Sequence, residues 1–91
     1  MAESYNKRIE HIHEKLLAKR NCAIDSFEVK ELIGEYGFVM KQLTQAKDEK
    51  GIMLAVADSF REGFYKEKLD AKYGEGAADF LVQAIETFYK S

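Results

Sequence analysis

Apolar side chains recur every three or four residues along most of this chain, which is the spacing of one face of an α-helix. Proline, the strongest helix breaker, is absent, so only glycines and short polar stretches interrupt these stripes. No segment alternates apolar and polar residues as a half-buried strand does. The pattern predicts an all-α fold, in a compact bundle of four to five helices.

The helix bounds follow from where the stripes begin and end. A polar break at 47–51 and a glycine-containing turn at 74–76 separate the later segments. A chain of 91 residues has room for one core, so we expect a single domain over residues 1–91. We expect main helices at about 4–20, 26–46, 48–64 and 76–89. Within 65–73 we expect either a short helix or a continuation of the helix before it.

The first predicted helix carries a narrow apolar seam that resembles one side of a coiled coil. Its residues are Tyr5, Ile9, Ile12 and Leu16, spaced four, three and four apart. The seam packs either against the rest of the chain or against a second copy, so a homodimer through these four residues is one expectation.

The second predicted helix begins with a capping signal and contains two glycines. Asp25 and Glu28 have the spacing of a capping box, with Asp25 or Ser26 as the cap. Gly34 and Gly37 lie three residues apart, near one face. They either relieve crowding or let another helix or a ligand approach the backbone closely.

Charge and cysteine content limit the partners and the compartment. The formal net charge is −2, from 14 basic and 16 acidic side chains, so we expect no direct binding to nucleic acid. No apolar run approaches the roughly 18–20 residues that cross a membrane. Cys22 is the single cysteine, and no apolar segment follows the first residues as in a signal peptide. We therefore expect a cytoplasmic protein that does not bind membranes.

The two histidines do not form a metal motif. His11 and His13 point to different sides of a helix, because two residues turn the helix by about 200°. Glu10, His13 and Glu14 share a face and make a weak ligand set. We expect them to be polar residues that face solvent, and we expect no metal site.

No catalytic pair can be assembled either. Cys22 follows a basic helix end, but a nucleophile also needs a base held beside it, so we expect a small apolar residue at a junction. Asp58 and Glu62 lie four apart and are expected to face solvent. We therefore expect a protein that is not an enzyme and uses no cofactor.

Aromatic residues are the most informative class in this sequence. Five tyrosines and six phenylalanines occur without tryptophan, and most of them follow residue 35. They form either an aromatic core or an aromatic-lined cleft for an apolar ligand.

Over about residues 24–89 the chain resembles the TipAS family, the antibiotic-recognition domain of thiostrepton-responsive regulators of the MerR type. The residues that carry the resemblance are Ser26–Ile33 with Tyr36, then Leu54–Phe60, then Gly76–Ile85. Tyr36 stands where the family usually has tryptophan. The match indicates a stand-alone and shortened version, without the DNA-binding half.

The resemblance implies a globin-like helical fold, related to transcription regulation, with a cleft for multicyclic, apolar peptide antibiotics. The thiostrepton-binding member holds its ligand through a cysteine before the third helix, where this chain has Gln45–Asp48, so covalent capture is not expected. We therefore expect non-enzymatic binding of a hydrophobic or multicyclic small molecule, or else a helical protein–protein interaction module. The matching cleft residues would be Tyr36, Phe60, Phe64, Tyr65 and Phe80.

Overall fold

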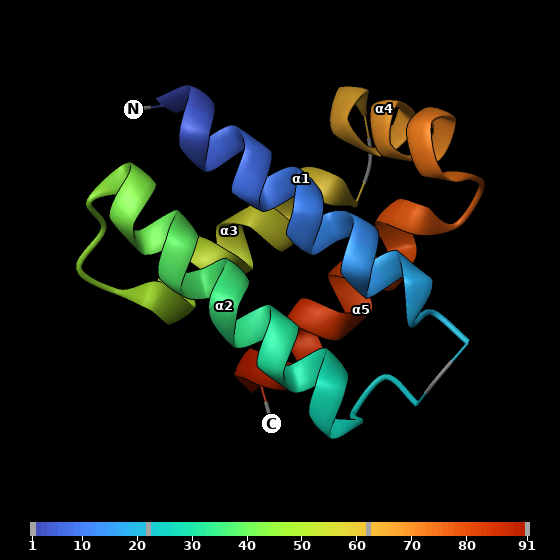
Figure 1. Cartoon of the computed structure of the whole chain (residues 1–91), viewed down its shortest axis with the longest axis horizontal. Helices are drawn as coiled ribbons and strands as arrows, with labels where there is room; N and C mark the ends of the chain where they lie inside the picture. The colour runs from blue at the N-terminus through green and yellow to red at the C-terminus, as the bar shows by residue number, and fades with distance from the viewer. Residues whose placement is uncertain (1, 22, 62, 91) are drawn as a thin grey trace.

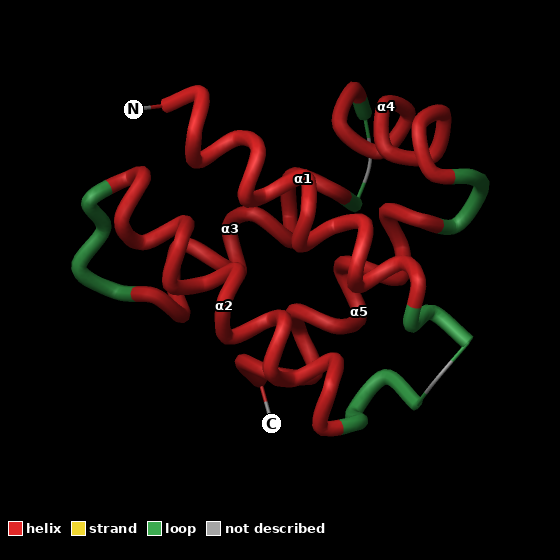
Figure 2. Tube along the Cα trace, in the orientation of Figure 1, coloured by secondary structure: helices red, strands yellow, loops and turns green. Residues whose placement is uncertain are grey.

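Five α-helices make up most of the computed structural model, which describes residues 2–21, 23–61 and 63–90 (Figure 1). Short loops connect the helices, and no strand occurs within these residues (Figure 2). The predicted all-α class is therefore confirmed, and the molecule is a compact globule. In chain order the helices are α1 (Ala2–Ala18), α2 (Phe27–Thr44), α3 (Glu49–Phe60), α4 (Phe64–Tyr73) and α5 (Ala77–Lys90).

Of the two alternatives for residues 65–73, the structure has the short separate helix and not a continuation of the third predicted helix. α3 ends at Phe60, and α4 begins at Phe64 after a break at Gly63. Gly63 has φ 84°, a backbone conformation that residues with a side chain rarely adopt. The expected range 48–64 was therefore too long, and the segment 65–73 belongs to a separate short helix.

Other helix ends also differ from the expected bounds. α1 ends at Ala18 and α2 at Thr44, where Gln45 takes a left-handed conformation with φ 56°. Ser26 is the N-cap of α2, and its hydroxyl accepts a hydrogen bond from the Val29 amide. The capping box of Asp25 with Glu28 was wrong, because the Glu28 carboxylate instead pairs with Lys19 at 2.7 Å.

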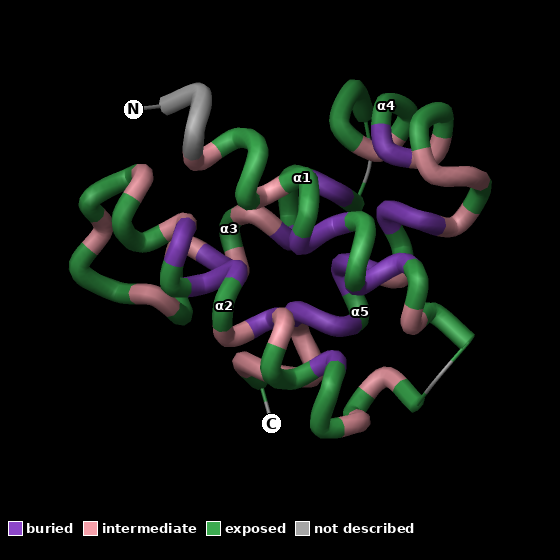
Figure 3. The backbone as a smooth tube through the Cα atoms, viewed as in Figure 1, coloured by how far each residue is buried: buried purple, intermediate pink, exposed green. Residues whose placement is uncertain are grey.

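The C-terminal helix is the centre of the packing. α5 packs against each of the other four helices, and the buried parts of the chain gather around it (Figure 3). Its apolar stripe is made of small and medium-sized side chains, so the neighbouring helices approach it closely. The buried members of this stripe are Ala77, Ala78, Leu81, Val82, Ala84 and Ile85.

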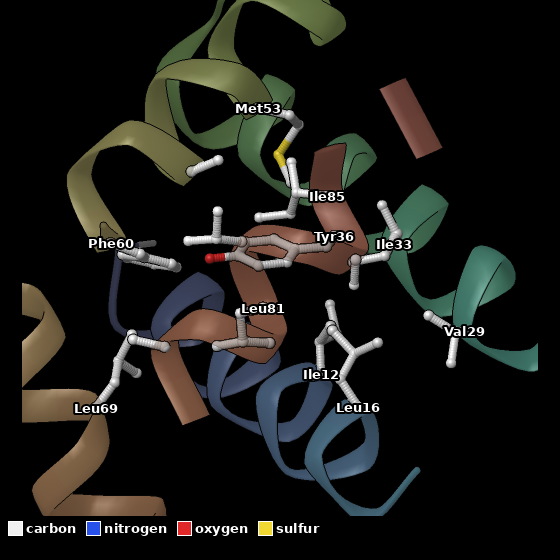
Figure 4. Packing of buried hydrophobic residues seen from close by; sticks show 14 of the residues in the cluster. Ile12, Leu16, Val29, Ile33, Tyr36, Met53, Phe60, Leu69, Leu81 and Ile85 are labelled. Carbon is white, nitrogen blue, oxygen red and sulfur yellow. The ribbon is translucent and has the colours of Figure 1, made fainter. Parts of the chain in front are cut away.

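Tyr36 of α2 lies inside the core, with 1% of its surface exposed. Its ring lies among Ile33, Leu81 and Ile85, and its hydroxyl points toward the side of Phe60 (Figure 4). A tyrosine is buried at low cost only where its hydroxyl finds a hydrogen-bond partner. Here the partner is His13 of α1, so the hydrogen bond also determines how α1 lies against α2.

The seam of α1 is used within the chain. Ile12 and Leu16 are buried in the core, whereas Tyr5 and Ile9 are half-buried against it. α1 packs on α2 and α5. Over the residues described, no helix is both long enough and apolar enough to cross a membrane.

Gly37 marks a close approach between α2 and the end of α5. The Tyr89 hydroxyl donates a 2.7 Å hydrogen bond to Glu49 directly over this glycine. A Cβ atom at Gly37 would collide with both groups. At Gly34 a Cβ atom would meet only the Phe88 ring, at 3.8 Å, which is an ordinary contact.

The two glycines should therefore respond oppositely to alanine. We expect Gly37→Ala to lower the free energy of unfolding by roughly 1–3 kcal/mol, because the added methyl displaces the Tyr89–Glu49 pair. Gly34→Ala should raise it by about 0.5–1 kcal/mol through better helix propensity. Urea denaturation followed by circular dichroism measures both, and equal effects of the two substitutions would contradict this packing.

Candidate functional site

A pocket of about 590 Å³ lies among the first four helices. Each of these helices supplies at least three side chains to its walls, and the deep part is more apolar than the entrance. The lining residues are Asn6, Ile9, Glu10 and His13 of α1; Tyr36, Met40 and Leu43 of α2; Val56, Ser59 and Phe60 of α3; and Tyr65, Lys68, Leu69, Lys72 and Tyr73 of α4.

The pocket is present because α1 and α4 are held apart. Within the described chain, α4 packs on α3 and α5 but is not packed closely on α1 (Figure 1). Leu69 is the buried residue of α4, and the Asp70 carboxylate accepts a 3.0 Å hydrogen bond from the Ala78 amide at the start of α5. These contacts fix α4 to α5 and leave its other side facing α1 across the pocket.

The pocket floor contains a buried polar pair. Nε2 of His13 lies 2.8 Å from the Tyr36 hydroxyl, in a hydrogen bond whose direction depends on the histidine tautomer. The imidazole is edge-on to three rings, with centroid distances of 5.0 Å to Tyr36, 6.0 Å to Phe60 and 6.4 Å to Tyr73. His13 is 7% exposed, so these rings largely enclose it.

Burial sets the protonation of both groups in this pair. Desolvation, helped by the positive charge of Lys72 and opposed by Glu10, lowers the pKa of His13 to about 4. Burial also raises the pKa of the Tyr36 phenol well above its usual value. The floor is therefore polar but carries no charge at neutral pH.

The expectation that His13 faces solvent was wrong. His13 follows Ile9 by four residues and precedes Leu16 by three, which places it on the apolar stripe of α1. That position was the sequence signal for a buried histidine. Glu10 and Glu14 are exposed as expected, and no group of three metal-ligating side chains is found among the described residues.

Three of the five aromatic residues predicted for a cleft meet at this pocket. Tyr36 and Phe60 lie at its floor, and Tyr65 lies at its edge with its ring 6.3 Å from that of Phe60. Phe64 is outside the pocket and 70% exposed, because the break at Gly63 turns it away from the face of Phe60. Phe80 is also outside the lining, half-buried against the core.

Sequence reasoning missed the whole α1 wall. Asn6, Ile9, Glu10 and His13 lie before residue 24, where the family resemblance begins, and they were interpreted as a generic helix. It also missed the aliphatic wall, because such residues are common in any core. That wall consists of Met40, Leu43, Val56 and Leu69.

Charged side chains stand at the entrance. Lys72 of α4 reaches toward Glu10 of α1, with 3.7 Å between Nζ and the carboxylate, and both are about half exposed. The Lys68 ammonium lies 5.8 Å from the centre of the Phe64 ring. Water screens an ion pair as exposed as Glu10–Lys72, so this pair spans the entrance without closing it firmly.

Tyr73 also belongs to the α4 side of the pocket. Its hydroxyl is buried and has no hydrogen-bond partner among the described residues. The phenol raises the pKa of the neighbouring Lys72 ammonium, although the two groups do not meet in hydrogen-bonding geometry.

Two residues considered for chemistry, Cys22 and Glu62, lie outside the described residues. Asp58 is exposed and pairs with Arg61 at 3.0 Å.

Comparison of the chain with family models, curated proteins and solved structures finds no match. The pocket must therefore be interpreted from its own residues.

The buried His13 makes stability depend on pH. The histidine has a pKa of about 4 in the fold and about 6.5 when unfolded, so the unfolded chain binds the proton more tightly. The stabilisation is complete above pH 6.5 and is lost as the pH falls from 6.5 toward 4. At pH 5 the loss should be about 2 kcal/mol relative to pH 8.

His13→Gln should lose this part of the pH dependence, because glutamine keeps a polar partner for Tyr36 and takes up no proton. His11→Gln, at an exposed position of the same helix, is the matched control and should behave like the wild type. Urea denaturation at several pH values measures the difference. A parallel pH dependence in His13→Gln and wild type would show that His13 is not buried as a neutral group.

Proposed function

We propose that this protein binds a hydrophobic or multicyclic small molecule, without catalysis, in the pocket among α1–α4. The observation that carries the proposal is the meeting of Tyr36, Phe60 and Tyr65 at one pocket rather than in separate parts of the core. A volume of about 590 Å³ lies in the range of ordinary small-molecule sites. Apolar walls with a smaller number of polar groups, which here include His13 and Ser59, are typical of such sites.

The resemblance to the TipAS family supports the same proposal. It implies a globin-like arrangement and an antibiotic-type ligand, and three of the five residues that it suggests line the pocket. The wall formed by α1 lies outside the matched region. Recognition by this chain would therefore include contacts from Ile9 and His13 that the resemblance does not supply.

The alternative of a homodimer through Tyr5, Ile9, Ile12 and Leu16 stays a prediction. Ile12 and Leu16 are already buried within one chain, which leaves Tyr5 and Ile9 as the accessible part of this seam. Sedimentation at several protein concentrations tests it. We expect a monomer, because so small an apolar area does not hold a stable dimer; a concentration-dependent dimer would favour the interaction module instead.

Titration of isotope-labelled protein, followed by nuclear magnetic resonance, tests ligand binding. We expect thiostrepton or the neutral fluorophore N-phenyl-1-naphthylamine to shift the amide signals of His13, Ser59 and Tyr65 in a saturable way. The same ligand should raise the melting temperature, since a ligand that binds only the folded state stabilises it.

A pocket-filling variant makes the test specific. Ser59 lines the pocket and is exposed to it, so Ser59→Phe should weaken binding about tenfold or more by occupying the space. Gln83→Phe, at an exposed position of α5 outside the lining, is the control and should bind as the wild type does. Absence of saturable shifts with either ligand, or equal effects of both substitutions, would refute the proposed site.

A further inference from the structure

We infer that the ligand preferred by this pocket is an amphipathic acid, in which a ring system enters the pocket and one anionic group stays at the entrance beside Lys68. The inference rests on the proposed function and specifies its ligand class. Two observations carry it. The floor of the pocket is uncharged whereas the entrance has charged side chains, and the rings of Phe60 and Tyr65 line the pocket.

The deep part of the pocket favours an uncharged ring system. His13 is neutral at pH 7 and is already paired with the Tyr36 hydroxyl, so the floor offers no counter-ion to a charged group. An unpaired charge at this depth would lose its hydration without gaining a counter-ion, which is unfavourable. Phe60 and Tyr65, with ring centres 6.3 Å apart, provide apolar faces and edges for a ring instead.

The entrance carries an excess of positive charge. Of the three ionic side chains that line the pocket, Glu10 and Lys72 are paired across it. The ammonium of Lys68 lies over the Phe64 ring and forms no ion pair with any carboxylate in the described part of the chain. One positive charge therefore remains among the side chains that line the pocket, and Glu14, which lies outside the lining, acts on Lys72.

This arrangement distinguishes among ligands. A cationic ligand would face Lys68 and Lys72 at the entrance, where Glu10 is already paired with Lys72, and would find no carboxylate at the floor. A neutral ligand gains the apolar contacts alone. An anionic group at the entrance keeps most of its hydration, because Lys68 is exposed, and it gains the attraction of that lysine without the cost of burial.

Two fluorophores with the same rings test the inference: anionic 8-anilinonaphthalene-1-sulfonate and neutral N-phenyl-1-naphthylamine. We expect Lys68→Glu to weaken binding of the sulfonate roughly three- to tenfold and to leave the neutral probe unchanged. Lys30→Glu makes the same change of net charge at an exposed position of α2 outside the pocket, and should affect neither probe. Raising the salt from about 0.01 M to about 1 M should weaken only the sulfonate.

The neutral probe distinguishes a failure of the proposed site from a failure of the inference about an acidic ligand. The proposed site stands if the neutral probe binds and the Ser59→Phe substitution weakens its binding. If Lys68→Glu then changes the binding of both probes equally, or of neither, the inference about the acid is overturned. If neither probe binds in a saturable way, the inference about the acid is overturned, and the proposed site falls with it when thiostrepton also fails to bind. A sulfonate that is no more sensitive to Lys68→Glu than to Lys30→Glu also overturns the inference.

Discussion

The hydrogen bond between His13 and Tyr36 joins two polar side chains that lie inside an otherwise apolar region. Either side chain alone would cost about 1–3 kcal/mol there, because it would lose its water without gaining a partner. The pair avoids this cost only when α1 and α2 lie in one particular register. A slide of α1 by one turn would leave both groups buried and unpaired. The same bond therefore fixes the two helices and forms the floor of the pocket.

The pocket itself follows from how unequally the helices are anchored. α5 packs on every other helix, and α1 and α2 are further fixed by the His13–Tyr36 bond. α4 is short and has Leu69 as its buried residue, so it is held mainly from the side of α5. The space between α4 and α1 is not filled by close helix packing and forms the pocket. A ligand in that space would bridge two helices that the chain does not pack closely together.

Much of this fold is predictable from the sequence because helical periodicity is a local signal. The spacing of Ile9, Ile12 and Leu16, or of Leu81 and Ile85, places them on a buried face whatever the helices pack against. Helix ends were less predictable. No glycine marks the left-handed Gln45, and α3 ends at Phe60, before the glycine that precedes Phe64, so the helix pattern alone shows neither end exactly.

The same reasoning explains which site residues were found. Phe60 and Phe64 lie four apart and would share a face on a continuous helix, but the break at Gly63 turns Phe64 into solvent. His13 was missed because its polar neighbours suggested an exposed face, although its spacing from Ile9 and Leu16 indicated the buried one. A buried polar residue is recognised from its position on the stripe rather than from its own chemistry. The hydrogen-bond partner that offsets the cost of burying His13 is Tyr36, which lies 23 residues away in the sequence. The two residues meet only when the helices pack together. This long-range pair also sets the polarity of the pocket floor, because it buries a histidine that stays neutral at pH 7 beside the Tyr36 hydroxyl.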